Sequence, residues 1–425
     1  MGTLLILTFL AMLLLGVPIA LSVGASSLLV LFLSEMPLEA LPQTLFAGVN
    51  SFALVAVPFF VMAGDLLAQG GISERIIAFA EAMLCRIRGG LSVVSVVASM
   101  FIAAISGSGA ATTAAVGSAL LPQLKKKGYD LDFSAALIAA AGTIGVVIPP
   151  SVPMVLYAVI AGVSVSRLFM AGFIPGLLMG AFLIFYALHV ARKRGYPAAN
   201  PELLNDRWRL FRQALWGLMT PLLILGGIFS GYFTPSEAAA VAVVYSLFVA
   251  LFIYKALSLK QVYRLVVNSG VTSALILFII ATAKIFGWQL AFYEIPDKVA
   301  SAMLSVAGGS SAMIYLMFIL LILLAGMFME TASALIILTP IFIPAVVGIG
   351  GDLIHFGLLM SVGLAIGMAT PPVAIDIYVA SAITGLSLEE ISRPILPMVA
   401  ALILTLILAT YVPWIVTALP QLIYG

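Results

Sequence analysis

The segment GTIGVVIPPSVPM, from Gly142 to Met154, places two adjacent prolines, Pro149 and Pro150, inside an apolar run long enough to cross a lipid bilayer. A proline inside a helix removes one backbone hydrogen bond and clashes with the preceding turn. Lipid supplies no water to satisfy the carbonyl groups that are left unpaired. The segment therefore predicts a membrane helix that is broken near its centre, with its free carbonyls satisfied by another partner.

The composition around this segment is that of a polytopic membrane protein. The chain has 425 residues, of which 63% are hydrophobic and 8% are charged, whereas about 25% are charged in an ordinary soluble domain. Apolar runs of about 18 residues or more recur along almost the whole chain and leave no room for a soluble domain. The single cysteine, Cys85, excludes an internal disulfide. The stretch from Leu4 to Leu33 is too long for a signal peptide and lacks a preceding basic region, so we expect a retained span.

The placement of lysine and arginine predicts the topology. Charged or Pro/Gly-rich gaps divide the chain into apolar segments at about residues 4–33, 44–68, 91–121, 133–163, 168–190, 214–232, 235–254, 266–292, 310–343, 353–383 and 394–418. If segments 91–121 and 310–343 each enter and leave on one side, 16 of the 19 lysines and arginines fall on one face. The positive-inside rule makes that face cytoplasmic. We expect nine crossings and two re-entrant hairpins, with the N-terminus in the cytoplasm and the C-terminus in the periplasm.

Each expected hairpin has polar or glycine residues halfway along its length. The turning points are SGSGAATT, from Ser106 to Thr113, and GMFMETAS, from Gly326 to Ser333. An arm of roughly 12–16 residues spans about 18–24 Å, which reaches the middle of the bilayer without crossing it. Two full but kinked spans are the alternative, and hairpins are favoured because they restore the charge asymmetry.

The broken segment occurs twice. In GLAIGMATPPVAIDI, from Gly363 to Ile377, Pro371 and Pro372 lie 222 residues after Pro149 and Pro150. The same offset relates other glycines and prolines, so the chain is an internal repeat. Because the two hairpins open to opposite faces, the repeats are inverted. Inverted repeats with broken helices at corresponding positions are typical of secondary transporters that bind their substrate at mid-membrane.

These features predict an all-α polytopic membrane protein with an inverted-repeat, ion-transporter-type fold, two re-entrant hairpins and two broken helices. The expected divisions are 1–68 (scaffold helices), 69–90 (amphipathic interfacial arm), 91–190 (first transport repeat), 191–292 (cytoplasmic loop and scaffold helices), 293–309 (second interfacial arm) and 310–425 (second transport repeat).

The hairpin tips and helix breaks are the candidate binding positions. Free carbonyls and hydroxyls suit sodium, whereas free amides at a helix start suit a carboxylate. The candidate sodium ligands are Ser106, Ser108, Gly142, Thr143, Pro149, Gly326, Glu330, Thr331, Ala365, Thr370 and Pro371. The candidate substrate contacts are Ser108, Thr112, Ser151 and Asp376. The alternative for any one of them is that small residues only permit close helix packing.

Four charged residues, Asp65, Lys284, Glu330 and Asp376, lie inside apolar segments. Each costs about 2.5–3.5 kcal/mol at the bilayer centre by insertion scales and is therefore a functional candidate. Glu330, at a hairpin tip, and Asp376, just after the second break, are favoured, and they also support proton coupling as an alternative. Asp65 and Lys284 are interpreted as snorkelling or as paired with a partner subunit.

Enzyme motifs are absent. His189 and His355 are isolated, and the sequence contains neither an HExxH nor a Walker motif. We expect a transporter rather than an enzyme or an ATP-driven pump, with no organic cofactor and no nucleic-acid partner. A channel with inverted repeats and a membrane-embedded enzyme or structural subunit are the rival classes.

Five ordered motifs resemble the large membrane subunit of tripartite ATP-independent periplasmic (TRAP) transporters over essentially the whole chain. They are VPFFVMAGDLL (57–67), SGSGAATTAAVGSALLP (106–122), GTIGVVIPPS (142–151), GIFSGYFTPSEAAAVA (227–242) and GMATPPVAIDIYVASAITG (367–385). The resemblance implies sodium-driven import of an organic acid across a bacterial inner membrane by an elevator mechanism. It also implies two partners, a small four-helix membrane subunit and a periplasmic substrate-binding protein.

The usual substrates of that family are carboxylates such as sialic acid or C4-dicarboxylates. No arginine lies within the expected broken helices. Hydroxyls and amide dipoles would then hold the carboxylate, which favours sialic acid or a similar polyol acid over a dicarboxylate. Na⁺ is the expected coupling ion, and a proton-coupled carboxylate or dicarboxylate transporter is the alternative.

Overall fold

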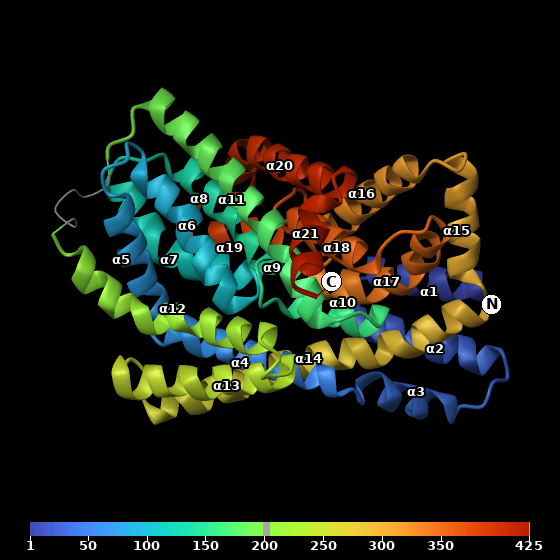
Figure 1. Cartoon of the computed structure of the whole chain (residues 1–425). Coiled ribbons are helices and arrows are strands. Elements are labelled where there is room, and N and C mark those ends of the chain that lie inside the picture. Colours follow the sequence, from blue (N-terminus) through green and yellow to red (C-terminus); the bar gives the residue numbers. More distant parts are fainter. Residues whose placement is uncertain (199–204, 425) are drawn as a thin grey trace.

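The computed structural model describes residues 1–198 and 205–424, which form helices and no strand. The helices make two layers, with two short helices lying across opposite ends (Figure 1). The lower layer in that view contains α2 (Ile19–Leu33), α3 (Ala40–Val49), η1 (Phe52–Val55), α4 (Ala56–Gln69), α12 (Arg207–Phe229), α13 (Pro235–Phe248), η3 (Val249–Ile253) and α14 (Leu259–Phe292). The first helix, α1 (Gly2–Leu14), packs against α2.

The upper layer contains both expected hairpins and both broken helices. Its helices are α6 (Gly90–Ser106), α7 (Gly109–Lys126), α8 (Leu131–Gly142), α9 (Ile144–Val147), α10 (Val152–Ala161), α11 (Val165–Arg194), α16 (Ser311–Phe328), α17 (Thr331–Gly348), α18 (Leu353–Met368), α19 (Ile375–Thr384), α20 (Leu388–Tyr411) and α21 (Trp414–Tyr424). The crossing helices are α5 (Ile72–Leu84) at one end and α15 (Ile295–Val306) at the other.

The diproline positions interrupt both helices, as predicted. The first break separates α9 from α10, and Ile148 there adopts an extended backbone with φ −74° and ψ 125°. Ser151 restarts the helix because its hydroxyl accepts a hydrogen bond from the backbone N–H of Met154 at 3.4 Å. The second break separates α18 from α19. Both Pro–Pro peptide bonds are cis.

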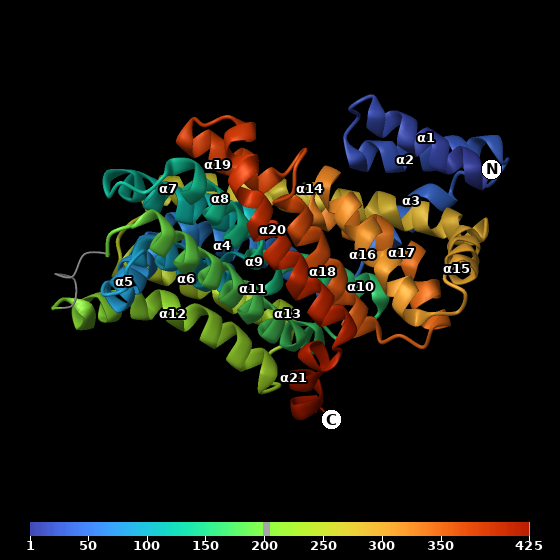
Figure 2. The same ribbon diagram turned by 90° about the horizontal axis from the view of Figure 1, so that it is seen from above.

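The hairpins α6–α7 and α16–α17 turn back midway, so the hairpin prediction is confirmed. The first turns at Gly107, whose φ of +62° favours glycine. A methyl group on Gly107 would also lie 2.8 Å from the carbonyl oxygen of Pro150. The first hairpin enters from the end that carries α5 and the second from the end that carries α15 (Figures 1 and 2). The two repeats are therefore inverted.

The N-terminal segment corrects two predictions. Residues 4–33 form two antiparallel helices, α1 and α2, because Gly16 (φ +79°) and Pro18 make a turn between them. The start of α1 packs against Ile295, and Ser34, just after α2, hydrogen-bonds the hydroxyl of Tyr293 at 2.9 Å. This hairpin therefore begins and ends beside α15 and is not a single crossing.

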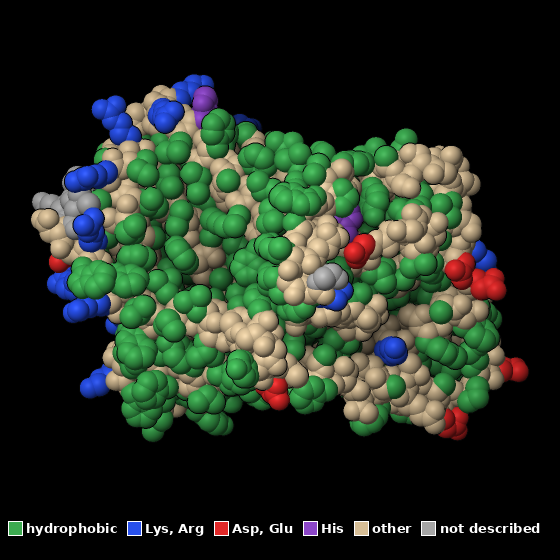
Figure 3. Space-filling view, in the orientation of Figure 1, with side chains coloured by type: hydrophobic (Ala, Val, Ile, Leu, Met, Phe, Trp, Pro, Cys, Tyr) green, Lys and Arg blue, Asp and Glu red, His purple; other side chains and the backbone are tan. Residues whose placement is uncertain are grey.

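The N-terminus consequently lies at the end opposite the basic loops, contrary to the expectation that it shares their face. Figure 3 shows lysine and arginine side chains gathered at the end that carries α5, and acidic side chains at the other end. Nine helices of the described residues are long and apolar enough to span a membrane. Two of these nine helices, α16 and α17, are arms of a re-entrant hairpin. The nine long helices are therefore not the same segments as the nine predicted crossings.

The basic end is held together by a polar cluster between the α7–α8 turn and the end of α11. Arg194 forms a salt bridge with the carboxylate of Asp130, and the hydroxyl of Tyr196 donates to the same carboxylate at 2.7 Å. Tyr129 donates to the carbonyl of Pro197 at 2.9 Å. The hydrogen bonds from Tyr196 and then Arg194 hold the pKa of Asp130 below its usual value.

Candidate functional site

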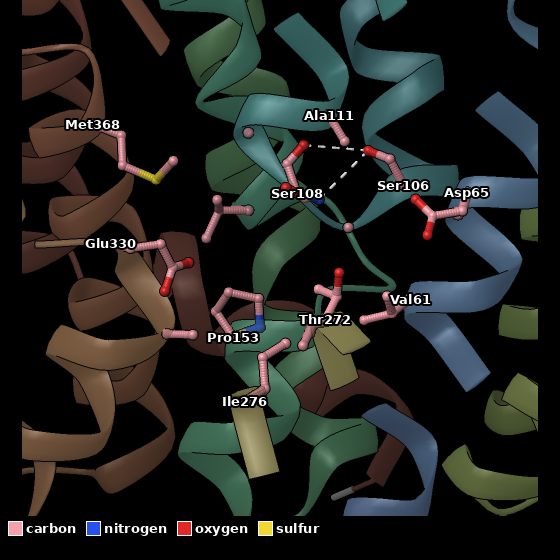
Figure 4. Close-up of a pocket in the computed structure, with 16 residues that line it drawn as sticks. Val61, Asp65, Ser106, Ser108, Ala111, Pro153, Thr272, Ile276, Glu330 and Met368 are labelled. Atoms are coloured by element: carbon pink, nitrogen blue, oxygen red, sulfur yellow. Dashed lines mark hydrogen bonds between the residues drawn. The ribbon is translucent and has the colours of Figure 1, made fainter. Parts of the chain in front are cut away.

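A cavity of about 310 Å³ lies where both hairpin tips meet the lower layer (Figure 4). Its wall contains residues of both tips, both breaks and two helices of the lower layer. These are Val61, Gly64, Asp65, Ser106, Gly107, Ser108, Gly109, Ala111, Val146, Val152, Pro153, Thr272, Ile276, Glu330, Ala332 and Met368. The cavity therefore occupies the position between repeats that the sequence predicts for a binding site.

The tip of the first hairpin is a compact hydroxyl cluster. Ser106 closes α6, and its hydroxyl lies 2.8 Å from that of Thr112. Thr112 donates to the carbonyl of Ser108 at 2.8 Å. Ser108 precedes α7 without capping it by its side chain, so the first amides of α7 have no side-chain partner at the cavity wall. Such amides carry partial positive charge and favour anions.

The first break packs directly onto this tip. A methyl group on Gly145 would lie 2.6 Å from both the carbonyl oxygen of Ser108 and the hydroxyl of Thr112. Thr143 is buried, and its hydroxyl donates to the carbonyl of Ala140 at 2.7 Å. Backbone and hydroxyl oxygens from two elements are thereby brought together, and these are the ligand types that hard cations prefer.

The tip of the second hairpin also lies at the cavity, but it carries a carboxylate where the first tip carries hydroxyl groups. Glu330 precedes α17 and caps it, because its carboxylate accepts a hydrogen bond from the N–H of Ser333 at 3.2 Å. The next residue, Thr331, is buried, and its hydroxyl lies 2.8 Å from the sulfur of Met368. Figure 4 shows Glu330 and Asp65 on opposite sides of the cavity.

The second hairpin is pressed against its own broken helix. A methyl group on Gly367 would lie 2.4 Å from the backbone of Gly326, so only glycines permit this approach. Ala365 is buried in α18, and Thr370, beyond its end, donates to the carbonyl of Ile366 at 2.7 Å. Pro371 follows in the break itself.

Three of the predicted site residues, Ser106, Ser108 and Glu330, line the cavity. The other candidates lie outside its wall. These are Thr112, Gly142, Thr143, Pro149, Ser151, Gly326, Thr331, Ala365, Thr370, Pro371 and Asp376. Ser151 and Asp376, which are predicted substrate contacts, are fully buried outside this wall, and their predicted role stays a prediction. Thr112 is linked to the cavity wall through its hydrogen bonds to Ser106 and Ser108.

Asp65 belongs to the cavity wall, although the sequence favours Glu330 and Asp376 over it. This residue on α4 lines the cavity and accepts a hydrogen bond from the hydroxyl of Ser269 on α14 at 2.6 Å. Asp65 therefore has a hydrogen-bond partner within this chain. The sequence does mark Asp65 as a candidate, because a carboxylate in an apolar segment is a functional candidate by default. Thr272 and Ile276, also on α14, carried no comparable signal, and Lys284 lines a separate cavity of about 420 Å³.

The ionisable side chains of the cavity wall are all acidic. Asp65 and Glu330 are its ionisable residues, and among the described residues no lysine, arginine or histidine lines it. An anionic ligand would meet repulsion from these carboxylates unless cations were bound nearby. The uncapped start of α7 is the feature of the wall that favours an anion.

Comparison with known proteins gives a family match over almost the whole chain. The family model described as "Tripartite ATP-independent periplasmic transporter, DctM component" matches residues 6–415. The C4-dicarboxylate TRAP transporter large permease protein DctM of Rhodobacter capsulatus is 40% identical, over 97% of each chain. The protein of the same name from Pseudomonas aeruginosa is 43% identical, over 94% of each chain.

A third relative is longer than this chain. The isethionate TRAP transporter permease protein DctMQ of Oleidesulfovibrio alaskensis is 40% identical over 98% of this chain but 65% of its own length. Two solved structures share the fold at low identity, Neisseria gonorrhoeae MtrF and Alcanivorax borkumensis YdaH. Both have a TM-score of 0.61, with 14% and 15% identity and coverage of 88% and 89% of this chain and 83% and 88% of theirs.

Proposed function

Because the chain belongs to the DctM family of tripartite ATP-independent periplasmic transporters, we propose that it is the large membrane subunit through which sodium drives the import of an organic acid. The observation that carries this proposal is the cavity of about 310 Å³ between the hairpin tips, with hydroxyls, backbone dipoles and two carboxylates in its wall. The site holds an acid only together with cations.

Sodium supplies the missing positive charge. Bound among the oxygens of Ser106, Ser108 and Thr112 and near Glu330, sodium ions would offset the negative charge of the wall and fix the tips against the breaks. The uncapped amides of α7 would then accept the carboxylate of the substrate. Coupling follows, because the acid binds well only after the ions have bound. Proton coupling through Glu330 and Asp376 is the alternative.

The substrate is a small organic acid anion. The two relatives of 40% and 43% identity that are named above for C4-dicarboxylates favour that class, whereas the cavity without arginine favours sialic acid or another polyol acid. The relative named for isethionate extends the range to a sulfonate. We place C4-dicarboxylates first and test the three classes together.

Transport requires the upper layer to move against the lower layer as an elevator. The cavity supports this, since its wall is shared between hairpin tips of the upper layer and helices α4 and α14 of the lower layer. A sliding layer would carry the tips and their ligands across the membrane while the lower layer stays in place. The basic end would face the cytoplasm of a bacterial inner membrane, and the N-terminus would belong to the opposite side.

Two protein partners complete the system. The relative named DctMQ extends beyond the region matched by this chain, which supports a small membrane subunit as a partner here. A periplasmic binding protein would deliver the acid to the face opposite the basic end.

The proposal is tested by uptake into proteoliposomes that contain this chain, its small subunit and its binding protein. Radiolabelled succinate, isethionate and sialic acid are each offered with an inward sodium gradient, and separately with an inward proton gradient in sodium-free buffer. We expect saturable uptake of one acid, and this uptake should require both sodium and the binding protein. A negative interior should increase the uptake, since a potential contributes about 2.3 kcal/mol per charge per 100 mV. Uptake driven equally well without sodium would overturn it.

A further inference from the structure

We propose that Asp376 and Thr113 form a buried binding site for a monovalent cation, apart from the cavity between the hairpin tips. Asp376 lies in the first turn of α19, and its side chain is fully buried. Neither of its carboxylate oxygens has a hydrogen-bond partner, and the hydroxyl of Thr113 on α7 is likewise buried and unpartnered. A buried carboxylate without a partner is costly, so this position calls for a positive ligand.

The oxygens converge around two glycines. A methyl group placed on Gly109 would lie 3.2 Å from Oδ2 of Asp376 and 3.4 Å from the carbonyl oxygen of Gly142. A methyl group placed on Gly142 would overlap the hydroxyl of Thr113 and lie 3.1 Å from the carbonyl oxygen of Gly109. A carboxylate, a hydroxyl and two carbonyls therefore surround the contact between α7, the end of α8 and the start of α19.

The donor set indicates the kind of ion. All four groups are hard oxygen donors, and among the described residues no cluster of three histidine, cysteine or acidic side chains exists that could hold a transition metal. A single carboxylate with neutral oxygens balances one positive charge. Sodium is the available ion if the sodium gradient drives transport, as proposed above. The need for a cation comes from the four oxygens and does not depend on that proposal.

The position differs from the hairpin-tip cluster. Thr112 turns to Ser106 and Ser108, whereas its neighbour Thr113 turns to Gly142. The Asp376 site also joins the two repeats, because α7 and α8 belong to the first and α19 to the second. An ion here would neutralise the carboxylate and hold the two repeats in register.

The test is equilibrium binding of ²²Na⁺ to the purified full chain, without substrate or transport. We expect Asp376→Asn to bind one sodium ion fewer per chain than the unmodified protein. Thr113→Val should bind the same number of sodium ions as the unmodified protein. Its affinity for one of them should fall about tenfold, which corresponds to ~1.4 kcal/mol. Asp132→Asn, which removes a carboxylate from the first turn of α8, is the matched control and should change neither quantity.

The proposal would be overturned if Asp376→Asn bound as many sodium ions as the unmodified protein. It would also be overturned if the ligand that Asp376 holds in the unmodified protein proved to be a proton and not a sodium ion. If Asp376→Asn does not fold, the affinity change in Thr113→Val decides the question. Ser106→Ala separates this proposal from the function proposed above, because it removes a hydroxyl of the hairpin tip only. Loss of an ion in Ser106→Ala with no change in Asp376→Asn would contradict the Asp376 site alone.

Discussion

Ser108 and Glu330 lie 222 residues apart, precede the second arms of the two hairpins and face the same cavity. The two residues differ in chemistry. Glu330 caps its helix with a carboxylate, whereas Ser108 leaves the start of α7 uncapped by a side chain. The second tip therefore adds a carboxylate that favours a cation, whereas the first tip offers hydroxyl oxygens beside free helix-start amides, although the backbone arrangement is repeated.

Ser108→Ala is expected to raise the sodium concentration for half-maximal uptake about tenfold, a loss of ~1.4 kcal/mol of binding energy. The reason is that Ser108 lines the cavity beside the hydroxyl cluster of the first tip. Sodium-dependent uptake by the reconstituted system measures it. Ser118→Ala, on the exposed face of the same helix, is the control and should leave the sodium dependence unchanged. An equal effect of both variants would argue against a local role for Ser108.

Glu330→Gln keeps a cap for α17 but removes the charge that faces the cavity. We expect uptake at a fixed sodium concentration to fall at least tenfold, a change of ~1.4 kcal/mol or more. Thermal unfolding should change by less than about 1 kcal/mol, because a neutral cap retains most of the capping effect. Glu389→Gln on the exposed start of α20 is the control. Unimpaired uptake in Glu330→Gln would show that the charge is dispensable.

Gly145→Ala should destabilise the first hairpin tip by about 1–3 kcal/mol, the usual cost of overpacking. The added methyl group would lie 2.6 Å from the carbonyl oxygen of Ser108, and backbone cannot move aside as a flexible side chain can. Unfolding in detergent and uptake are the measurements. Gly270→Ala has open space around it and should be neutral or slightly stabilising. Similar behaviour of the two variants would mean that the tip does not pack on α9 as described.

Thr3→Cys and Lys126→Cys test the corrected topology. Thr3 lies at the end opposite the basic loops, and Lys126 lies at the basic end of α7. In intact cells, a membrane-impermeant maleimide should label Thr3→Cys but reach Lys126→Cys only after permeabilisation. The native Cys85 is buried and serves as the unlabelled background. Labelling of Thr3→Cys only after permeabilisation would restore a cytoplasmic N-terminus.

Asp130→Asn should lower stability at neutral pH by roughly 0.5–1 kcal/mol, the range of partly exposed ion pairs. Because the pKa of Asp130 is lowered in the folded protein from its usual 3.8, the stabilisation is present above that value and is lost as the pH falls through the folded pKa. Unfolding of both proteins between pH 7 and pH 3 measures the difference. A difference that grows on acidification would contradict the assigned partners Tyr196 and Arg194.

Much of the fold could be predicted because it depends on local chemistry. The proline pairs that begin at Pro149 and Pro371 interrupt their helices, and the hairpins turn back at the polar tips near Ser108 and Glu330. The failure at residues 4–33 has an equally local cause. Gly16 and Pro18 make a turn that a window of average hydrophobicity does not detect.

The site was predicted less completely, because adjacency across the sequence is not a local property. Asp65 is held at the cavity because α4 packs against α14. There it accepts a hydrogen bond from Ser269, which lies 204 residues away in the sequence. Asp376, a predicted substrate contact, is buried beside Gly109 and outside the wall of the cavity. Neither outcome follows from the spacing of residues along the chain.

The sequence by itself determined that this protein spans a membrane, repeats itself in inverted order and breaks two helices at mid-membrane, because hydrophobic length, charge bias and proline sterics act within single segments. The tertiary structure alone decided which polar atoms share a cavity, which are sealed away from it, and on which side the chain begins. The physical reason is that each of these depends on how separate helices pack, and packing brings together residues that the sequence keeps far apart.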